Sequence, residues 1–216
     1  MTRMQTVIAI LLTTILLAPV ACRSDDAPEP APPTARSAKA APPTERVVGP
    51  LTTKDAEALA TMTERIKQYV ELHTRIEGTL PGFPTEATPE QIDEHQRAFE
   101  KAMREARATA KHGDIFTPEA RPVIKKLLAQ IFGGPDGKSL KSSIMDENPV
   151  DPNAMKITVN SRYPDTVPLA TIPPQVLQAL PDLTEDLEYR FIGDWLILLD
   201  AKAHIIADYM PDALPK

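Results

Sequence analysis

Seven prolines between Arg23 and Pro50 constrain the fold of this chain more than any other feature. The same segment holds six alanines and no aromatic residue, so it cannot bury enough apolar surface to offset the entropy of ordering it. The Pro-Pro pairs at 32–33 and 42–43 favour extended polyproline II. We therefore expect residues 22–50 to form a disordered tether, either a spacer or a segment that threads peptidoglycan, and residues 51–216 to form one domain.

The first 21 residues have the pattern of an export signal. Arg3 supplies an early positive charge, and an apolar run follows from Val7 to Leu17. As a helix this run would measure about 16 Å, which is too short for a bilayer core of about 30 Å. Residues 1–21 are therefore predicted to be a signal peptide, with an uncleaved membrane anchor as the alternative.

Cys22 is the only cysteine of the chain and follows Val20-Ala21 at the end of that signal. The arrangement resembles the lipobox of bacterial lipoproteins, although Pro19 stands where that family usually has Leu. The resemblance implies acylation of Cys22 and stable membrane anchoring through several acyl chains. It also implies a periplasm-facing place in the cell envelope, and Arg23, in place of Asp, favours the outer membrane.

The charge of residues 51–216 excludes one class of partner. This part has 19 Lys and Arg residues against 26 Asp and Glu residues, a net charge of about −7. Such an acidic domain lacks the basic surface that nucleic-acid binding requires. The expected partners are a membrane, through the lipid anchor, and an envelope protein or peptidoglycan.

The first half of the domain, residues 51–134, is predicted to be helical. Apolar residues recur every three or four positions over 54–77 and again over 88–110, as on the buried face of a helix. Thr52 with Asp55, and Thr88 with Gln91, are typical capping boxes. These two helices are expected to form a hairpin. A third helix is predicted to begin near Thr117 and to end at Gly133-Gly134.

The second half, residues 150–216, has the patterns of a sheet. Apolar and polar residues alternate over 155–160, a short helix is predicted for 173–180, and three further runs read as a strand meander. The central run, Trp195 to Leu199, is nearly all apolar, as in a strand that is covered on both faces. The expected fold class is α+β: a helical hairpin and a third helix, then a mostly antiparallel sheet.

The last quarter of the chain also resembles a group of uncharacterised secreted or lipidated bacterial proteins. The resemblance rests on Tyr163-Pro164, Pro173-Pro174, residues 187–190, Leu196, Leu198, Asp200, Ile206 and Asp208. It implies no activity and assigns no functional residue.

Two histidines are candidate metal ligands. His73 and His95 lie on the apolar seams of the first two helices, at similar heights in an antiparallel hairpin. Glu77 and Glu94 are near them in the sequence, and two imidazoles with a carboxylate can hold a divalent ion. The alternative is a pair of semi-buried histidines that hydrogen bond to carboxylates or water.

Other polar residues are predicted to have structural roles. His112 is expected to cap the end of the second helix, and Asp200 and Asp208 to cap turns beside the meander. The run Gly133 to Ser139 is not a phosphate loop, because it follows a helix and no helix is expected after it. Tyr189 and Arg190 are a possible binding surface for a strand or peptide.

No catalytic motif is present in the sequence, and no cofactor is expected. The preferred hypothesis is a non-enzymatic envelope lipoprotein that binds a protein or polymer. The alternatives are a metal-assisted hydrolase built on His73 and His95, and a binder of small ligands that uses the space between the helices and the sheet.

Overall fold

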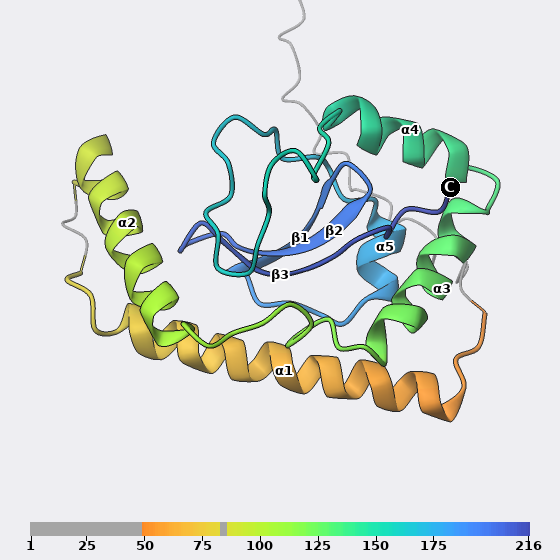
Figure 1. Ribbon diagram of the computed structural model, residues 1–216, viewed down its shortest axis with the longest axis horizontal. Coiled ribbons are helices and arrows are strands. Elements are labelled where there is room, and N and C mark those ends of the chain that lie inside the picture. The colour runs from red at the N-terminus through yellow and green to blue at the C-terminus, as the bar shows by residue number, and fades with distance from the viewer. Residues whose placement is uncertain (1–48, 83–85) are drawn as a thin grey trace, which may run out of the picture. The chain divides into compact units, whose positions relative to one another are not determined.

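A computed structural model describes residues 49–82 and 86–216 (Figure 1). The described residues therefore do not include the predicted signal peptide, Cys22 or nearly all of the predicted tether. The elements are α1 (Thr53–Glu77), α2 (Pro89–Ala106), α3 (Ala120–Phe132), α4 (Gly137–Glu147), α5 (Pro174–Ala179), β1 (Leu187–Ile192), β2 (Trp195–Asp200) and β3 (Ile205–Met210). The predicted α+β class is confirmed. Within the described residues, no helix is both long and apolar enough to cross a membrane.

Both predicted capping boxes are formed. The Thr52 side chain accepts a hydrogen bond from the Asp55 N–H at 3.2 Å, and the Asp55 carboxylate accepts one from the Thr52 N–H at 3.1 Å. Thr88 and Gln91 make the equivalent pair at 3.3 and 2.9 Å. These bonds satisfy backbone donors that a helix start leaves without partners, so the starts of α1 and α2 follow from local sequence.

The three strands form one antiparallel sheet in the order β1-β2-β3. A two-residue turn joins β1 to β2, and Gly193 supplies its positive φ of 54°, which suits the right-handed twist of a hairpin. A bulge between Leu198 and Leu199 shifts the register of β2 against β3. β2 is buried from Leu196 to Asp200, as expected for a central strand that is covered on both sides.

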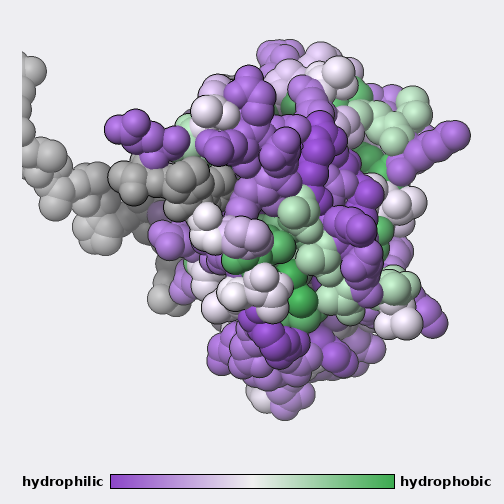
Figure 2. Space-filling view, turned by 90° about the vertical axis from the view of Figure 1, so that its left-hand side faces the viewer, coloured by the Kyte–Doolittle hydropathy of each residue, from purple (hydrophilic) through white to green (hydrophobic). Residues whose placement is uncertain are grey.

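Different parts of the chain cover the two faces of the sheet. Tyr189, Phe191 and Leu198 belong to the main core, which they share with α1, α2 and α3. Ile192, Ile197 and other residues of the opposite face pack against the long segment that precedes α5. On the side of the molecule that carries α2, hydrophilic side chains surround a smaller hydrophobic area (Figure 2).

The strand predicted over residues 155–160 is absent. Lys156 and Asn160 have positive φ values of 51° and 63°, which interrupt extended backbone. The segment turns instead, and residues 160–163 then bind the outer edge of β3. The Asn160 N–H donates to the Ile206 carbonyl at 2.9 Å, and the Ile206 N–H donates to the Ser161 carbonyl at 2.9 Å. The alternating pattern came from burial against the sheet and not from membership of it.

Two helix boundaries also differ from expectation. α2 ends at Ala106 and does not extend to residue 110, because the following backbone turns to surround the buried Asp208 carboxylate of β3. α3 begins at Ala120, after a turn in which the Ala120 N–H donates to the Thr117 hydroxyl at 3.2 Å. The end of α2 is thus set by a contact with a residue that is distant in sequence, and the start of α3 is set by a local turn.

A helix that the sequence did not predict begins within the glycine-rich run of residues 133–139. α4 begins at Gly137, where a Cβ would collide with the backbone of Phe132. Only glycine permits this close approach of α3 and α4. The expectation that no helix follows the run was wrong, although the run does follow a helix, unlike a phosphate loop.

Candidate functional site at the edge of strand β1

His73 is a buried histidine with a carboxylate partner. It is 1% exposed, and its Nδ1 lies 2.7 Å from Oδ2 of Asp200. Its ring packs edge-on against Phe99 of α2, with the ring centroids 4.8 Å apart. Phe99 lies one turn beyond His95, so α1 and α2 meet in a register that places this phenyl ring against His73.

The second nitrogen of His73 faces two more carboxylates. Nε2 is 3.6 Å from Glu77 and 3.8 Å from Asp186, and it makes no hydrogen bond. The Lys202 ammonium binds both of these carboxylates, at 3.0 and 2.9 Å. Burial by itself lowers the pKa of His73, but the hydrogen bond to Asp200 and the charges of Asp200, Asp186 and Glu77 outweigh it and raise the pKa above its usual value.

This arrangement gives the metal hypothesis no support. His95 is half-buried on α2, and Glu94 beside it is exposed. Among residues 49–82 and 86–216, no group of three or more His, Cys, Asp or Glu side chains could hold a metal ion. The acids beside His73 are instead neutralised by Lys202.

Asp200 and Asp208 are buried anions that organise the fold. Asp200 accepts hydrogen bonds from the Tyr69 hydroxyl at 2.7 Å and from the Ala203 N–H at 2.8 Å, which caps the turn after β2. Asp208 accepts from the backbone N–H groups of residues 113, 115 and 116 at 2.9 to 3.2 Å. Burial, followed by the charge of Asp200, raises the pKa of Tyr69 well above its usual value. The sequence carried no signal for the pairing of Tyr69 with Asp200.

His112 does not cap α2, because that helix ends before it. Its ring stacks on Tyr209, with the centroids 4.2 Å apart, and its Nε2 is 3.0 Å from the Tyr209 carbonyl oxygen. Tyr209 in turn stacks with Trp195 at 5.1 Å. The predicted capping role of His112 was therefore wrong, and the residue joins the 107–116 segment to β3.

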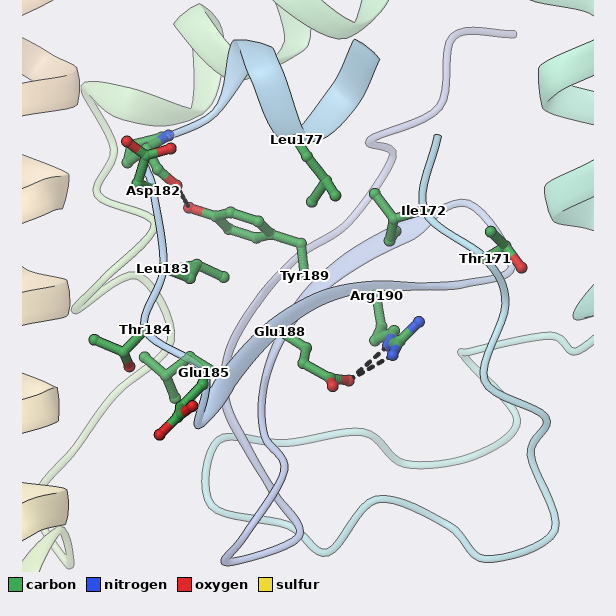
Figure 3. Close-up of a pocket in the computed structure, with 12 residues that line it drawn as sticks. Thr171, Ile172, Leu177, Asp182, Leu183, Thr184, Glu185, Glu188, Tyr189 and Arg190 are labelled. Carbon is green, nitrogen blue, oxygen red and sulfur yellow. Dashed lines mark hydrogen bonds and ion pairs between the residues drawn. The ribbon is translucent and has the colours of Figure 1, made fainter. Parts of the chain in front are cut away.

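A groove of about 480 Å³ runs along β1 and contains both residues of the predicted binding surface (Figure 3). Its lining comes from three parts of the chain: residues 171–172 with Leu177 of α5, residues 181–185, and residues 187–190 of β1. Tyr189 and Arg190 do not share a face of the sheet, because neighbouring residues of a strand point to opposite sides. They line one groove because the groove follows the edge of the strand.

The two sides of the groove differ in chemistry. Ile172, Leu177 and Leu183 lie on the same side as the Tyr189 ring, whose hydroxyl donates to the Pro181 carbonyl at 3.1 Å (Figure 3). Burial, followed by the charge of Asp182, raises the pKa of Tyr189, so its hydroxyl stays protonated. Leu177 is 46% exposed although it is a large hydrophobic residue.

The other side of the groove is charged. The Arg190 guanidinium binds the Glu188 carboxylate at 2.6 and 2.8 Å and donates to the Ala170 carbonyl at 3.1 Å (Figure 3). Asp182 and Glu185 lie on the exposed rim. An extended segment in this groove would thus meet apolar side chains on one face and charged side chains on the other.

The outward-facing residues of β1 are buried: Leu187, Tyr189 and Phe191 are 3%, 2% and 0% exposed. The turn closes with the pair Ile192–Trp195, so residues 192, 190 and 188 direct their N–H and C=O groups toward β2, and residues 187, 189 and 191 direct theirs outward. Two outward groups have partners: the Leu187 N–H donates to Thr184 at 3.2 Å, and the Phe191 carbonyl accepts from Asn148 at 3.1 Å. The N–H and C=O of Tyr189 have no hydrogen bond to the residues that the structure describes.

No protein-family model, characterised protein or solved structure matches this chain.

Proposed function

We propose that this chain is a non-enzymatic, membrane-anchored module of the bacterial envelope that binds an extended segment of protein at the edge of β1. The observation that carries the proposal is the groove of about 480 Å³ along β1, with the 46% exposed Leu177 on its apolar side and the Glu188–Arg190 pair on its charged side. Two walls of unlike chemistry would hold an extended segment in one orientation.

The chemistry of the groove favours a strand over a small ligand. An extended segment gains specificity from alternate side chains that enter different environments. The apolar and charged sides of the groove supply two such environments. We therefore expect the bound segment to alternate apolar and polar residues.

The anchor is proposed from the sequence alone. Cys22 would carry the acyl chains, and the 28 residues 23–50 would hold the domain up to roughly 85 Å from the bilayer, at about 3.1 Å per residue. The Cys22→Ser variant should lose acyl labelling and move to the soluble fraction. A variant that stays labelled and bound to membranes would contradict the anchor but leave the groove untouched.

Photo-crosslinking in intact cells tests the groove. A photoreactive residue at Leu177, which is 46% exposed over the groove, should form covalent adducts with protein. The matched control is Ile92 on α2, which is 50% exposed and does not line the groove. Adducts from position 177 alone would support the proposal. Adducts from neither position, or equally from both, would contradict it.

A further inference from the structure

We infer that His73 forms a pH-operated clasp with Glu77 and Asp186, and that the protonated clasp ties residues 184–186 to α1 and fixes one end of the groove along β1. This inference rests on the proposed function, because it names the regulation of the same groove. Three observations carry it: a buried ring nitrogen without a hydrogen bond, two acids that face this nitrogen, and the backbone bonds that join one of these acids to the wall of the groove.

The first observation is the state of the two ring nitrogens of His73. The ring is 1% exposed, and its Nδ1 lies 2.7 Å from the Asp200 carboxylate, whereas its Nε2 makes no hydrogen bond to the residues that the structure describes. Because the carboxylate is an acceptor, Nδ1 is the nitrogen that carries the proton of the neutral ring. The neutral ring therefore presents a bare lone pair at Nε2, and the protonated ring presents an N–H donor there.

Two carboxylates from different parts of the chain face Nε2. Glu77 of α1 lies 3.6 Å from it, and Asp186, which precedes β1, lies 3.8 Å from it. Both acids also bind the Lys202 ammonium, but the Lys202 side chain is 48% exposed, so these ion pairs contribute little by themselves. With Asp200, three acids surround one ammonium, and the cluster has a charge of −2 while His73 is neutral and −1 once it is protonated.

The other groups around the ring add no compensating charge. Tyr69 of α1 donates its hydroxyl to Asp200 and stays protonated, because burial raises its pKa. α2 contributes the uncharged ring of Phe99. Burial lowers the pKa of His73, but the hydrogen bond to Asp200 and the charges of the three acids raise it overall, above the usual value of about 6.5. The clasp is therefore closed at mildly acidic pH, and it loses its proton and opens as the pH rises.

Asp186 joins the clasp to the groove. Its carbonyl accepts a hydrogen bond from the Ala201 N–H at 2.9 Å, and the next residue, Leu187, donates its N–H to the Thr184 carbonyl at 3.2 Å. Thr184 and Glu185 line the groove on the side where β1 begins (Figure 3). The closed clasp thus holds this wall in place, and a wall that is fixed in advance lowers the cost of ordering a bound segment. We expect the groove to bind its segment more tightly at mildly acidic pH.

The test is amide hydrogen exchange, followed by NMR over a pH series, of the full chain that carries Cys22→Ser. The N–H groups of Leu187 and Ala201 report the clasp, since their hydrogen bonds hold residues 184–186. At every pH they should exchange faster than the amides of the central strand β2, because local opening precedes global unfolding. After correction for intrinsic exchange, their protection should fall by up to about tenfold per pH unit between the pKa values of the closed and open forms, where opening releases one proton.

Two variants and a control assign the effect to the clasp. His73→Gln removes the titrating ring, and Asp186→Asn removes the acid that joins the ring to the groove, so protection of the two reporter amides should no longer depend on pH in either variant. Asp186→Asn leaves the buried pair of His73 and Asp200 intact, and it decides the question if His73→Gln does not fold. The control is His112→Gln, which removes an exposed imidazole outside the clasp and should keep the slope of the unsubstituted chain.

The inference is overturned if the two reporter amides of the unsubstituted clasp keep the same protection at all pH values, or if they exchange only together with β2. It is also overturned if Asp186→Asn keeps the pH slope. Because exchange is measured without a partner, these outcomes leave the crosslinking at position 177 to decide the proposed function separately. Conversely, a groove that forms no adducts would contradict the proposed function but would not change the exchange result.

Discussion

Replacing Asp200 by asparagine should destabilise the fold more at acidic than at alkaline pH. Asp200 is fully buried, and its Oδ2 receives both the Tyr69 hydroxyl and the Nδ1 of His73 at 2.7 Å, while Oδ1 receives the Ala203 N–H. The side-chain amide of asparagine has one acceptor oxygen, whereas the carboxylate of aspartate has two. If that atom stays with Tyr69 and His73, the amide NH₂ faces the Ala203 N–H, and a buried donor is left without a partner.

The magnitude has two parts. An unsatisfied buried donor costs about 1–3 kcal/mol. Removing one partner of a buried ion pair costs about 3–5 kcal/mol, but only while His73 carries its proton. Because the pKa of His73 in the folded protein is raised, its protonated form stabilises the fold below the unfolded pKa of about 6.5, and this stability is lost as the pH rises through the folded pKa. Asp200→Asn should therefore cost the sum of both parts, about 4–8 kcal/mol, at about pH 5.5, and only the first part, about 1–3 kcal/mol, at about pH 9.

Urea unfolding followed by the fluorescence of Trp195, the single tryptophan, measures both values. The matched control is Asp93→Asn, which removes the charge from an exposed pair with Arg97 and should change the free energy of unfolding by less than about 0.5 kcal/mol. A loss below about 1 kcal/mol at acidic pH, or a loss that is the same at both pH values, would refute the reasoning.

Three further predictions concern other parts of the network and the sheet. The unfolding free energy of the wild type should fall as the pH rises above about 6.5, and His73→Gln should remove the part of this slope that His73 contributes, as parallel urea titrations would show. Asp208→Asn should cost about 2–4 kcal/mol and speed amide exchange at residues 113, 115 and 116, because their N–H groups lose an anionic acceptor; unchanged exchange would contradict this. Gly193→Ala should cost about 1–3 kcal/mol in thermal unfolding, since φ is 54° and a Cβ would lie 2.6 Å from the Val150 carbonyl oxygen, whereas Gly82→Ala meets no atom within 4 Å.

Local sequence was enough to predict the elements whose causes are local. The capping boxes at Thr52 and Thr88 and the apolar run of β2 act over a few residues, and each is found as expected. The errors occurred in segments whose conformation depends on contacts with residues that are distant in sequence. The 107–116 segment leaves the helix to surround Asp208, and residues 155–160 turn although their burial alternates.

The candidate site shows the same division. Tyr189 and Arg190 were predicted as a binding surface, but the sequence could not show that their strand is an edge, since that depends on the order of strands in the sheet. The partnership of Tyr69 with Asp200 spans 131 residues. Periodicity identifies the buried face of an element, but it does not identify which buried polar groups meet.

Both edges of the sheet are covered, and this limits what the protein can assemble into. Residues 160–163 bind the outer edge of β3. At the edge of β1, the Thr184 carbonyl and the Asn148 side chain already hold outward backbone groups, and Leu187, Tyr189 and Phe191 are at most 3% exposed. A sheet with two open edges could add strands without end, as in a fibril, whereas a sheet of three strands with both edges covered resists that growth.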